Sequence, residues 1–250
     1  MALLALALPL LLATPRPAVA MELLSWWRRD LLTPNWEPGD WATYAQTEWT
    51  EDGVVADTVT VEVLPAASED ARWFEITSTA GRGADRLLIR PLALRDAMDA
   101  LDAVDSLLRR EGDGPWIAED LDAYRDQRLV QRHLEDPFRD PEIVRHVLAD
   151  TVVTGTKITR ERVEMHEVQR SERSMGRSTL VLTTELHANA VISPEIPLAG
   201  ILRAHSVSTV RSETIRDGST RRRRDRPPLV TESTIECIAF GRTGSHPKSH

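Results

Sequence analysis

Apolar and polar residues alternate with a period of two along much of the first third of the chain, which is the pattern of half-buried β-strands. In the first such run Trp41, Thr43, Ala45, Thr47 and Trp49 share one face. The Asp-Gly pair at residues 52–53 is typical of a hairpin turn. Further alternating runs cover residues 58–64, 71–77 and 86–90. We therefore expect an antiparallel meander of about four strands before residue 92.

The pattern changes between residues 92 and 150. Apolar residues now recur at spacings of three and four, the period of an α-helix, at Leu94, Met98, Leu101, Val104 and Leu108. Further helices are predicted at residues 119–133 and 141–148. These segments together predict a helical insert. The acidic residues Asp96, Asp99, Asp102 and Asp105 line the first helix, where we interpret them as a solvated face rather than a cation site.

Strand-like sequence, rich in Val, Thr and Ile, returns at Thr151 and continues to Phe240. A sheet of about eight strands would curl, and helices would cover its concave face. The predicted fold class is therefore α+β, with a large curled antiparallel sheet (an open half-barrel) and a helical insert, residues 92–150, packed on one face. We expect a single domain over residues 21–241 and a disordered tail at 242–250.

Residues 1–20 have the pattern of a cleavable secretory signal. An uncharged Leu- and Ala-rich run, too short to span a bilayer, is followed by a proline-broken stretch and by small residues at 18–20. No Lys or Arg precedes the run, so Met21 as the true start stays an alternative. No cysteine follows the run, which speaks against a lipid-anchored start. We expect a periplasmic or secreted protein.

Composition favours a folded chain held together by packing. The sequence is 41% hydrophobic, with seven Trp, and Cys237 is its only cysteine, so no internal disulfide can form. The net charge of −8 hides an asymmetry: residues 21–150 carry 14 Arg against 28 acidic residues, whereas residues 151–250 carry 16 basic against 11 acidic residues. The two halves should attract each other or present faces of opposite sign.

Arginine is concentrated in one cluster, which consists of Arg221, Arg222, Arg223, Arg224 and Arg226. Because the chain has the pattern of an exported protein, we exclude nucleic acid as its partner. The alternatives are a solvated loop, an internal counter-charge, and a surface that binds an anionic membrane or an acidic protein.

Known catalytic patterns are missing from the sequence. His166-Glu167 begins like a zinc-protease motif, but Arg170 stands where the second histidine belongs. The sequence has no Gly-x-Ser-x-Gly elbow, phosphate loop, dinucleotide fingerprint or paired-cysteine motif. We expect no enzyme, no cofactor and no metal, with the histidines structural or solvent-facing.

The tryptophans are the strongest positive feature, since all seven precede residue 117. They either fill a core or line an apolar groove under the curled sheet that accepts an acyl chain or an apolar peptide. The candidate groove consists of Trp41, Trp49, Trp73, Met98 and Leu101.

Three segments together resemble a loose group of exported bacterial β-proteins of unknown function. They are Gly-Asp-Trp-Ala-Thr-Tyr at residues 39–44, Val-Val-Thr-Gly-Thr at 152–156, and Ile-Ser-Pro-Glu-Ile-Pro-Leu-Ala-Gly-Ile-Leu at 192–202. The resemblance covers residues 40–64 and 151–210. The order of sheet and helix is also similar to that of periplasmic lipoprotein carriers of the LolA/LppX type, which bind lipid in a half-barrel. That likeness is one of fold and implies no site residue.

The leading functional prediction is a non-enzymatic envelope protein that binds a lipid or lipid-linked ligand between sheet and helices. The alternative is a structural or protein-interaction module of the envelope that docks a partner through the basic loop at residues 221–226.

Overall fold

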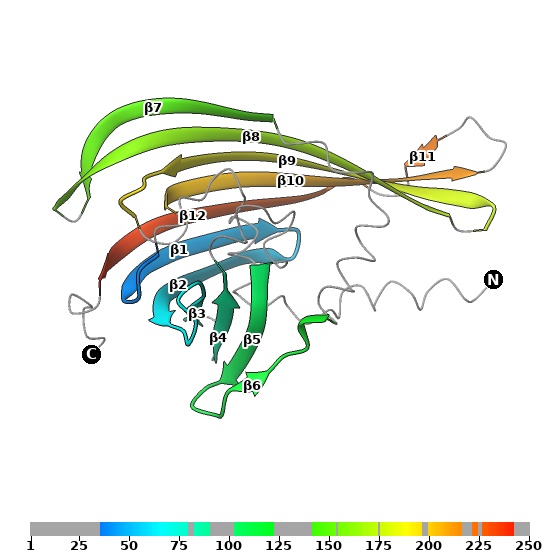
Figure 1. Ribbon diagram of the computed structural model, residues 1–250. Helices are drawn as coiled ribbons and strands as arrows, with labels where there is room; N and C mark the ends of the chain where they lie inside the picture. Colours follow the sequence, from blue (N-terminus) through cyan, green and yellow to red (C-terminus); the bar gives the residue numbers. More distant parts are fainter. Residues whose placement is uncertain are drawn as a thin grey trace.

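The structure, a computed structural model, describes residues 36–79, 83–90, 103–122, 142–153, 155–174, 176–196, 200–216, 222–224 and 227–242. These residues form one twelve-stranded sheet in which every pairing is antiparallel (Figure 1). The strands are β1 (Asp40–Thr50), β2 (Gly53–Pro65), β3 (Arg72–Ser78), β4 (Gly83–Ile89), β5 (Val104–Glu111), β6 (Ile117–Ala118), β7 (Glu142–Val153), β8 (Thr156–Ser174), β9 (Ser178–Ile192), β10 (Ile201–Arg216), β11 (Arg222–Arg224) and β12 (Leu229–Arg242).

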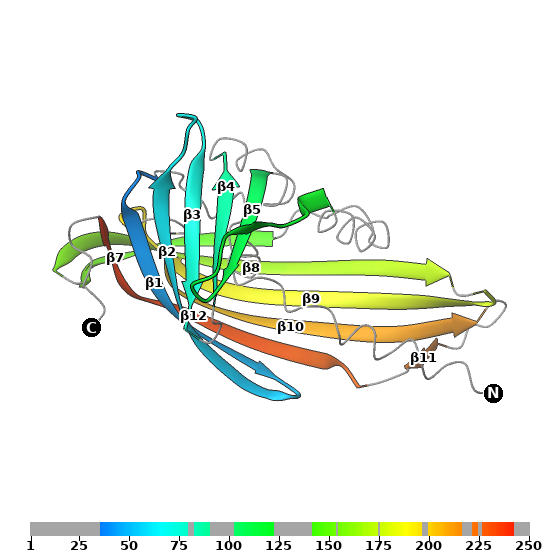
Figure 2. The same cartoon turned by 90° about the horizontal axis from the view of Figure 1, so that it is seen from below.

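The sheet is open, and its strand order shows how the N-terminal and C-terminal halves of the chain are joined. Its order is β6-β5-β4-β3-β2-β1-β12-β10-β9-β8-β7, with β11 beside β10. The last strand therefore pairs with the first and links the N-terminal meander to the long C-terminal strands. Figure 2 shows β1–β5 crossing β8–β10 at a steep angle, so the sheet curls, while β8, β9 and β10 extend well past the meander.

One face of the curled sheet carries the hydrophobic core, and we call it the inner face. Ala42 and Tyr44 of β1, Phe74 of β3, Ala190 of β9 and Ile235 of β12 are among its buried residues. Because successive strand residues point to opposite sides, the residues between them belong to the outer face. Both halves of the chain contribute to this one core. Since Cys237 is the only cysteine, no internal disulfide links the halves, and side-chain packing holds them together.

The predicted α+β class and the helical insert at residues 92–150 are wrong, because the described part of that segment is sheet. The reason is visible in β5, where residues 104–111 pair with β4. A register shift makes Asp105 an extra residue: Ser106 lies opposite Leu88 and Val104 opposite Ile89. The bulge turns Val104 and Leu107, three residues apart, to the same buried side. The bulge thus breaks the alternation expected of a strand, and the buried partner of Val104 is Leu107 rather than Leu108, which the predicted helical face had used.

The predicted helix at residues 141–148 is also a strand, β7, which pairs with β8 over most of its length. Its β-branched residues, Ile143, Val144, Val147, Val152 and Val153, are typical of strands. Antiparallel pairing with β8 therefore makes this segment a strand, although its local pattern predicted a helix.

Other sequence predictions fall wholly or mostly outside the described residues. They are the signal at 1–20, the tail from residue 243, three of the four aspartates of the acidic face (Asp96, Asp99 and Asp102), and the 119–133 helix beyond its first four residues. Within the described segments, no helix is both long enough and apolar enough to cross a membrane.

Two glycines explain parts of the segments at 39–44 and 192–202. Gly39 has a φ of 94° at the turn that leads into β1, and its amide donates to the Val63 carbonyl at 2.7 Å. Gly200 has a φ of 64°, and an added Cβ would lie 3.0 Å from the Ser193 carbonyl oxygen. The Ser193 amide donates to the Gly200 carbonyl at 2.7 Å, which closes the loop between β9 and β10. Both positions therefore favour glycine for its backbone freedom and small size.

Candidate functional site

The inner face continues beyond the core along β9 and β10 as a strip without charge. Its members are half-buried, and we call them the neutral strip: Leu180, Leu182, Thr184, Leu186 and Ala188 of β9, and Ser206, Ser208, Val210, Ser212 and Thr214 of β10. No register shift interrupts this part of the pairing, so all ten residues share the face of Ala190 and Ala204. Five consecutive inward positions on β9 and five on β10 thus carry no ionisable group.

The neutral strip combines apolar and hydroxyl side chains pair by pair. Leu186 lies opposite Ser208, Val210 opposite Thr184, and Leu182 opposite Ser212. Such a surface offers hydrocarbon contact together with hydrogen-bonding groups that fix orientation, which is the usual composition of sites for small apolar ligands. It can therefore hold a chain-like molecule that carries an ester or amide group.

Sequence reasoning missed the neutral strip, although a signal was present. In the β9 sequence Ser178–Ile192 every second residue from Leu180 to Ala190 is uncharged, whereas the residues between them include Glu185 and His187. The alternation separates neutral from charged positions rather than strictly apolar from polar positions. A search for apolar runs alone therefore misses it.

The predicted groove residues lie elsewhere. Trp41 and Trp49 alternate with the core residues of β1, and Trp73 precedes the core residue Phe74, so these three tryptophans belong to the outer face. Trp41 is buried, Trp73 is half-buried, and Trp49 is 38% exposed. Met98 and Leu101 lie outside the described residues. The structure therefore does not gather the five residues on the inner face, and their role in binding stays a prediction.

The basic cluster is described only in part. Arg222, Arg223 and Arg224 form β11, which pairs with residues 213–215 of β10. Arg221 and Arg226 lie outside the described residues. Docking of a membrane or an acidic partner by this cluster stays a prediction.

The outer face of the same long strands is charged. At its middle, His187 Nε2 lies 3.0 Å and His166 Nε2 3.5 Å from the same oxygen, Glu185 Oε1, and Arg211 Nη1 lies 3.2 Å from Glu185 Oε2. The hydrogen bond with His187 is the main cause that holds the pKa of Glu185 below its usual value. Of the described residues, His166, Glu185 and His187 make up the group of three ligand-type side chains that lie close enough to share a metal ion.

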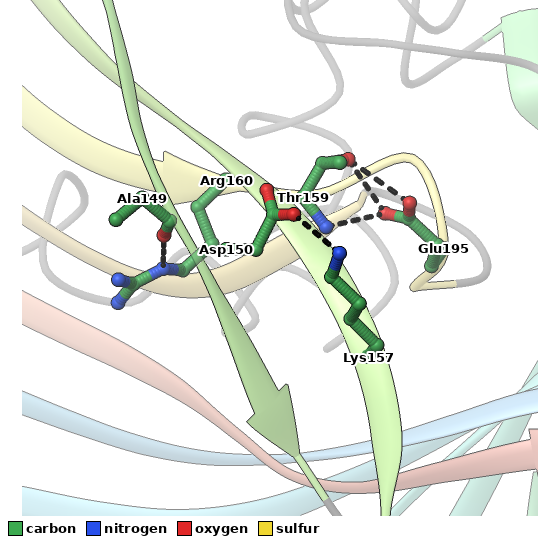
Figure 3. A network of polar contacts seen from close by, with 6 residues as sticks. All are labelled: Ala149, Asp150, Lys157, Thr159, Arg160 and Glu195. Carbon is green, nitrogen blue, oxygen red and sulfur yellow. Dashed lines mark hydrogen bonds and ion pairs between the residues drawn. The ribbon is translucent and has the colours of Figure 1, made fainter.

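A polar network fixes the end of the inner face where β7 turns into β8 (Figure 3). Glu195, in the loop after β9, accepts hydrogen bonds from the Thr159 hydroxyl at 2.9 Å and from the Ser193 hydroxyl at 2.7 Å. Burial alone would raise the pKa of Glu195, but these hydrogen bonds from Ser193 and Thr159 leave it lowered. Arg160 Nε donates to the Ala149 carbonyl at 2.9 Å, next to the register shift in β7. The network therefore ties the β9–β10 loop and the β7 bulge to β8.

No protein-family model and no curated protein sequence matches this chain. Among solved structures, it is similar to a domain described as an outer membrane lipoprotein-sorting protein domain from Vibrio parahaemolyticus. The match covers 85% of this chain and 88% of that chain, with 9% sequence identity and a TM-score of 0.30. At this TM-score the likeness carries no functional weight.

Proposed function

We propose that this protein is an exported, non-enzymatic envelope protein that holds a lipid or lipid-linked acyl chain along the neutral strip. The single observation that supports the proposal is the run of ten uncharged, half-buried inner-face residues on β9 and β10. The ligand lies against the curl of the sheet rather than against the tryptophans of the outer face. Export rests on the signal pattern at residues 1–20.

The chemistry of the two faces supports this choice of ligand. A hydrocarbon chain gains about 0.8 kcal/mol for each CH₂ group that leaves water, so a long acyl chain needs only a continuous uncharged surface. The outer face of β9 and β10 carries Glu185, His187, His205, Arg211 and Glu213, which would have to give up their hydration under such a ligand. The neutral strip itself has no such cost along β9 and β10, although Glu167 of β8 lies buried on the inner face opposite Leu186.

The test is to purify the full chain from the envelope fraction, extract it with organic solvent and identify bound lipid by mass spectrometry. Intact mass of the same sample shows whether the chain begins at Met21. Binding is then measured by the fluorescence of N-phenyl-1-naphthylamine, an apolar probe, with and without competing fatty acid.

Matched substitutions locate the ligand. Leu182→Asp and Val210→Asp place a carboxylate in the neutral strip and should weaken probe binding by about tenfold or more. Thr183→Asp and Thr209→Asp place the same charge one residue away, on the outer face, and should leave binding unchanged. Equal loss in both pairs, or a lipid-free wild-type protein that does not bind the probe, would overturn the proposal.

A further inference from the structure

Two histidines and a glutamate on the outer face converge on one point. His166 comes from β8, and Glu185 and His187 come from β9, where the spacing of two residues puts both on one side of the strand. His166 lies directly opposite His187, and their rings stack with centroids 4.3 Å apart and planes 14° from parallel. Antiparallel pairing thus brings together three side chains that lie up to 21 positions apart in the sequence.

The distances among the three ligand atoms match those around a tetrahedral metal ion. The two imidazole nitrogens lie 3.5 and 3.0 Å from Glu185 Oε1, and all three atoms lie within 4.8 Å of one another. Zinc bonds of about 2.0–2.2 Å to nitrogen and oxygen place tetrahedral ligands about 3.3 Å apart. Because an imidazole binds a metal through a lone pair in the ring plane, at least one of the two stacked rings must turn for both nitrogens to face one ion.

A polar nitrogen that faces the cluster supports a ligand there. His166 Nε2 is buried, and no described residue makes a hydrogen bond to it that meets normal geometry. Such an atom is unfavourable unless a further group satisfies it. The shared Glu185 oxygen lies 3.5 Å away, at the limit of a hydrogen bond, and already takes the shorter hydrogen bond with His187.

Arg211 prepares the carboxylate for one-oxygen binding. Its guanidinium lies on Glu185 Oε2, the oxygen that faces away from the histidines, and leaves Oε1 for the ion. Partners of this kind orient ligating carboxylates in metal sites. The side chains of His166, His187 and Glu185 are 40%, 58% and 28% exposed, so an ion can reach the cluster and keep water in its remaining position.

We propose that His166, His187 and Glu185 form a binding site for a divalent transition-metal ion of the zinc type, independent of the lipid proposed for the inner face. Two imidazoles and one carboxylate favour zinc and its neighbours over Ca²⁺ and Mg²⁺, which prefer oxygen ligands. The proposal replaces the expectation from the sequence that no metal site exists.

The experiment is a calorimetric titration of untagged, EDTA-treated full chain with Zn²⁺ at neutral pH, with Ca²⁺ as the comparison ion. We expect one Zn²⁺ per chain, no Ca²⁺ binding at the same concentrations, and a higher melting temperature with Zn²⁺. His187→Gln, His166→Gln and Glu185→Gln should each weaken Zn²⁺ binding by about tenfold or more and remove the thermal shift.

Two control variants separate this site from other histidines. His205→Gln changes an exposed outer-face histidine that pairs with Glu232 at 2.8 Å, and it should bind Zn²⁺ like the wild type. The double variant His246→Gln/His250→Gln removes the histidines of the tail and should also bind normally. If the wild type binds no Zn²⁺, or if His187→Gln and Glu185→Gln bind it as the wild type does, the proposal is overturned.

Discussion

At the residue scale, the one thiol of the chain is buried where β12 meets β1. Burial is the main cause that raises the pKa of Cys237 from 9.0 to about 12. At pH 8 this raised pKa lowers the thiolate fraction by a factor on the order of a thousand, so folded protein should react with iodoacetamide much more slowly than protein in urea. Alkylation rates followed by intact mass check the expectation.

The same shift fixes the direction of a pH effect on stability. Because the folded state holds the Cys237 proton more tightly than the unfolded chain, this thiol contributes stability at pH values below about 9 and loses it as pH rises toward about 12. Cys237→Ala should therefore show a flatter decline of unfolding free energy over that window. Equal alkylation rates in folded and unfolded protein would contradict the burial.

The sequence indicates the surroundings of this residue, because a lone cysteine flanked by Ile235 and Ile238 is typical of a small buried apolar side chain, and Cys237 is buried. It could not predict the triad on the outer face. His166 and His187 have no helical or loop spacing in common, and only the register of β8 against β9 sets them side by side. A ligand set assembled by strand register leaves no local motif in the sequence.

At the element scale, bulges decided where sequence reasoning failed. The register shift in β5 interrupts the alternation of that strand between Val104 and Leu107, and the shift in β7 interrupts the alternation of β7. The prediction at residues 71–77 matches β3 to within one residue at each end, and the prediction at 58–64 covers the core residues of β2 but begins five residues late. Local periodicity therefore predicts regular strands, but a single extra residue removes the alternation by which a strand is recognised.

The junction between β1 and β12 offers a test of how elements are held together. Asp40 is buried, and its Oδ1 lies 3.0 Å from Arg242 Nε, while its Oδ2 accepts a hydrogen bond from the Glu37 amide at 2.9 Å. Asp40→Ala should lower the unfolding free energy in urea by about 1–3 kcal/mol, since it removes a buried charged acceptor and leaves the Glu37 amide and the Arg242 guanidinium without this partner.

Glu37 provides the matched control for Asp40. Its carboxylate pairs with the same Arg242 at 2.9 Å, but both of these side chains are more than half exposed. Exposed ion pairs contribute little, so Glu37→Ala should cost less than about 1 kcal/mol. Similar losses in the two variants would show that burial does not set the strength of this junction.

At the scale of the whole molecule, the described residues form one open sheet, whereas the sequence predicted a sheet covered by helices. The structure joins the two halves of the chain through β1 and β12 within a single core. That the charge asymmetry makes the halves attract each other or present faces of opposite sign stays a prediction. An open sheet must also protect its ends, because unpaired strand edges bind other chains. Among the described strands, β7 forms one end of the sheet.

The β7 end exposes three valines among charged residues such as Glu142, Arg145 and Asp150. Val144, Val147 and Val152 are 42%, 91% and 67% exposed. Exposed apolar edge strands associate with one another unless a charge prevents it. Val147→Lys should therefore reduce self-association at rising protein concentration, as measured by sedimentation velocity, and leave the melting temperature within about 2 °C because the side chain is almost fully in water.

Ile238→Lys places the same charge at a 51% exposed site on β12, an interior strand, and should not change association. An equal effect of the two substitutions would mean that added charge, rather than the edge position of β7, governs association.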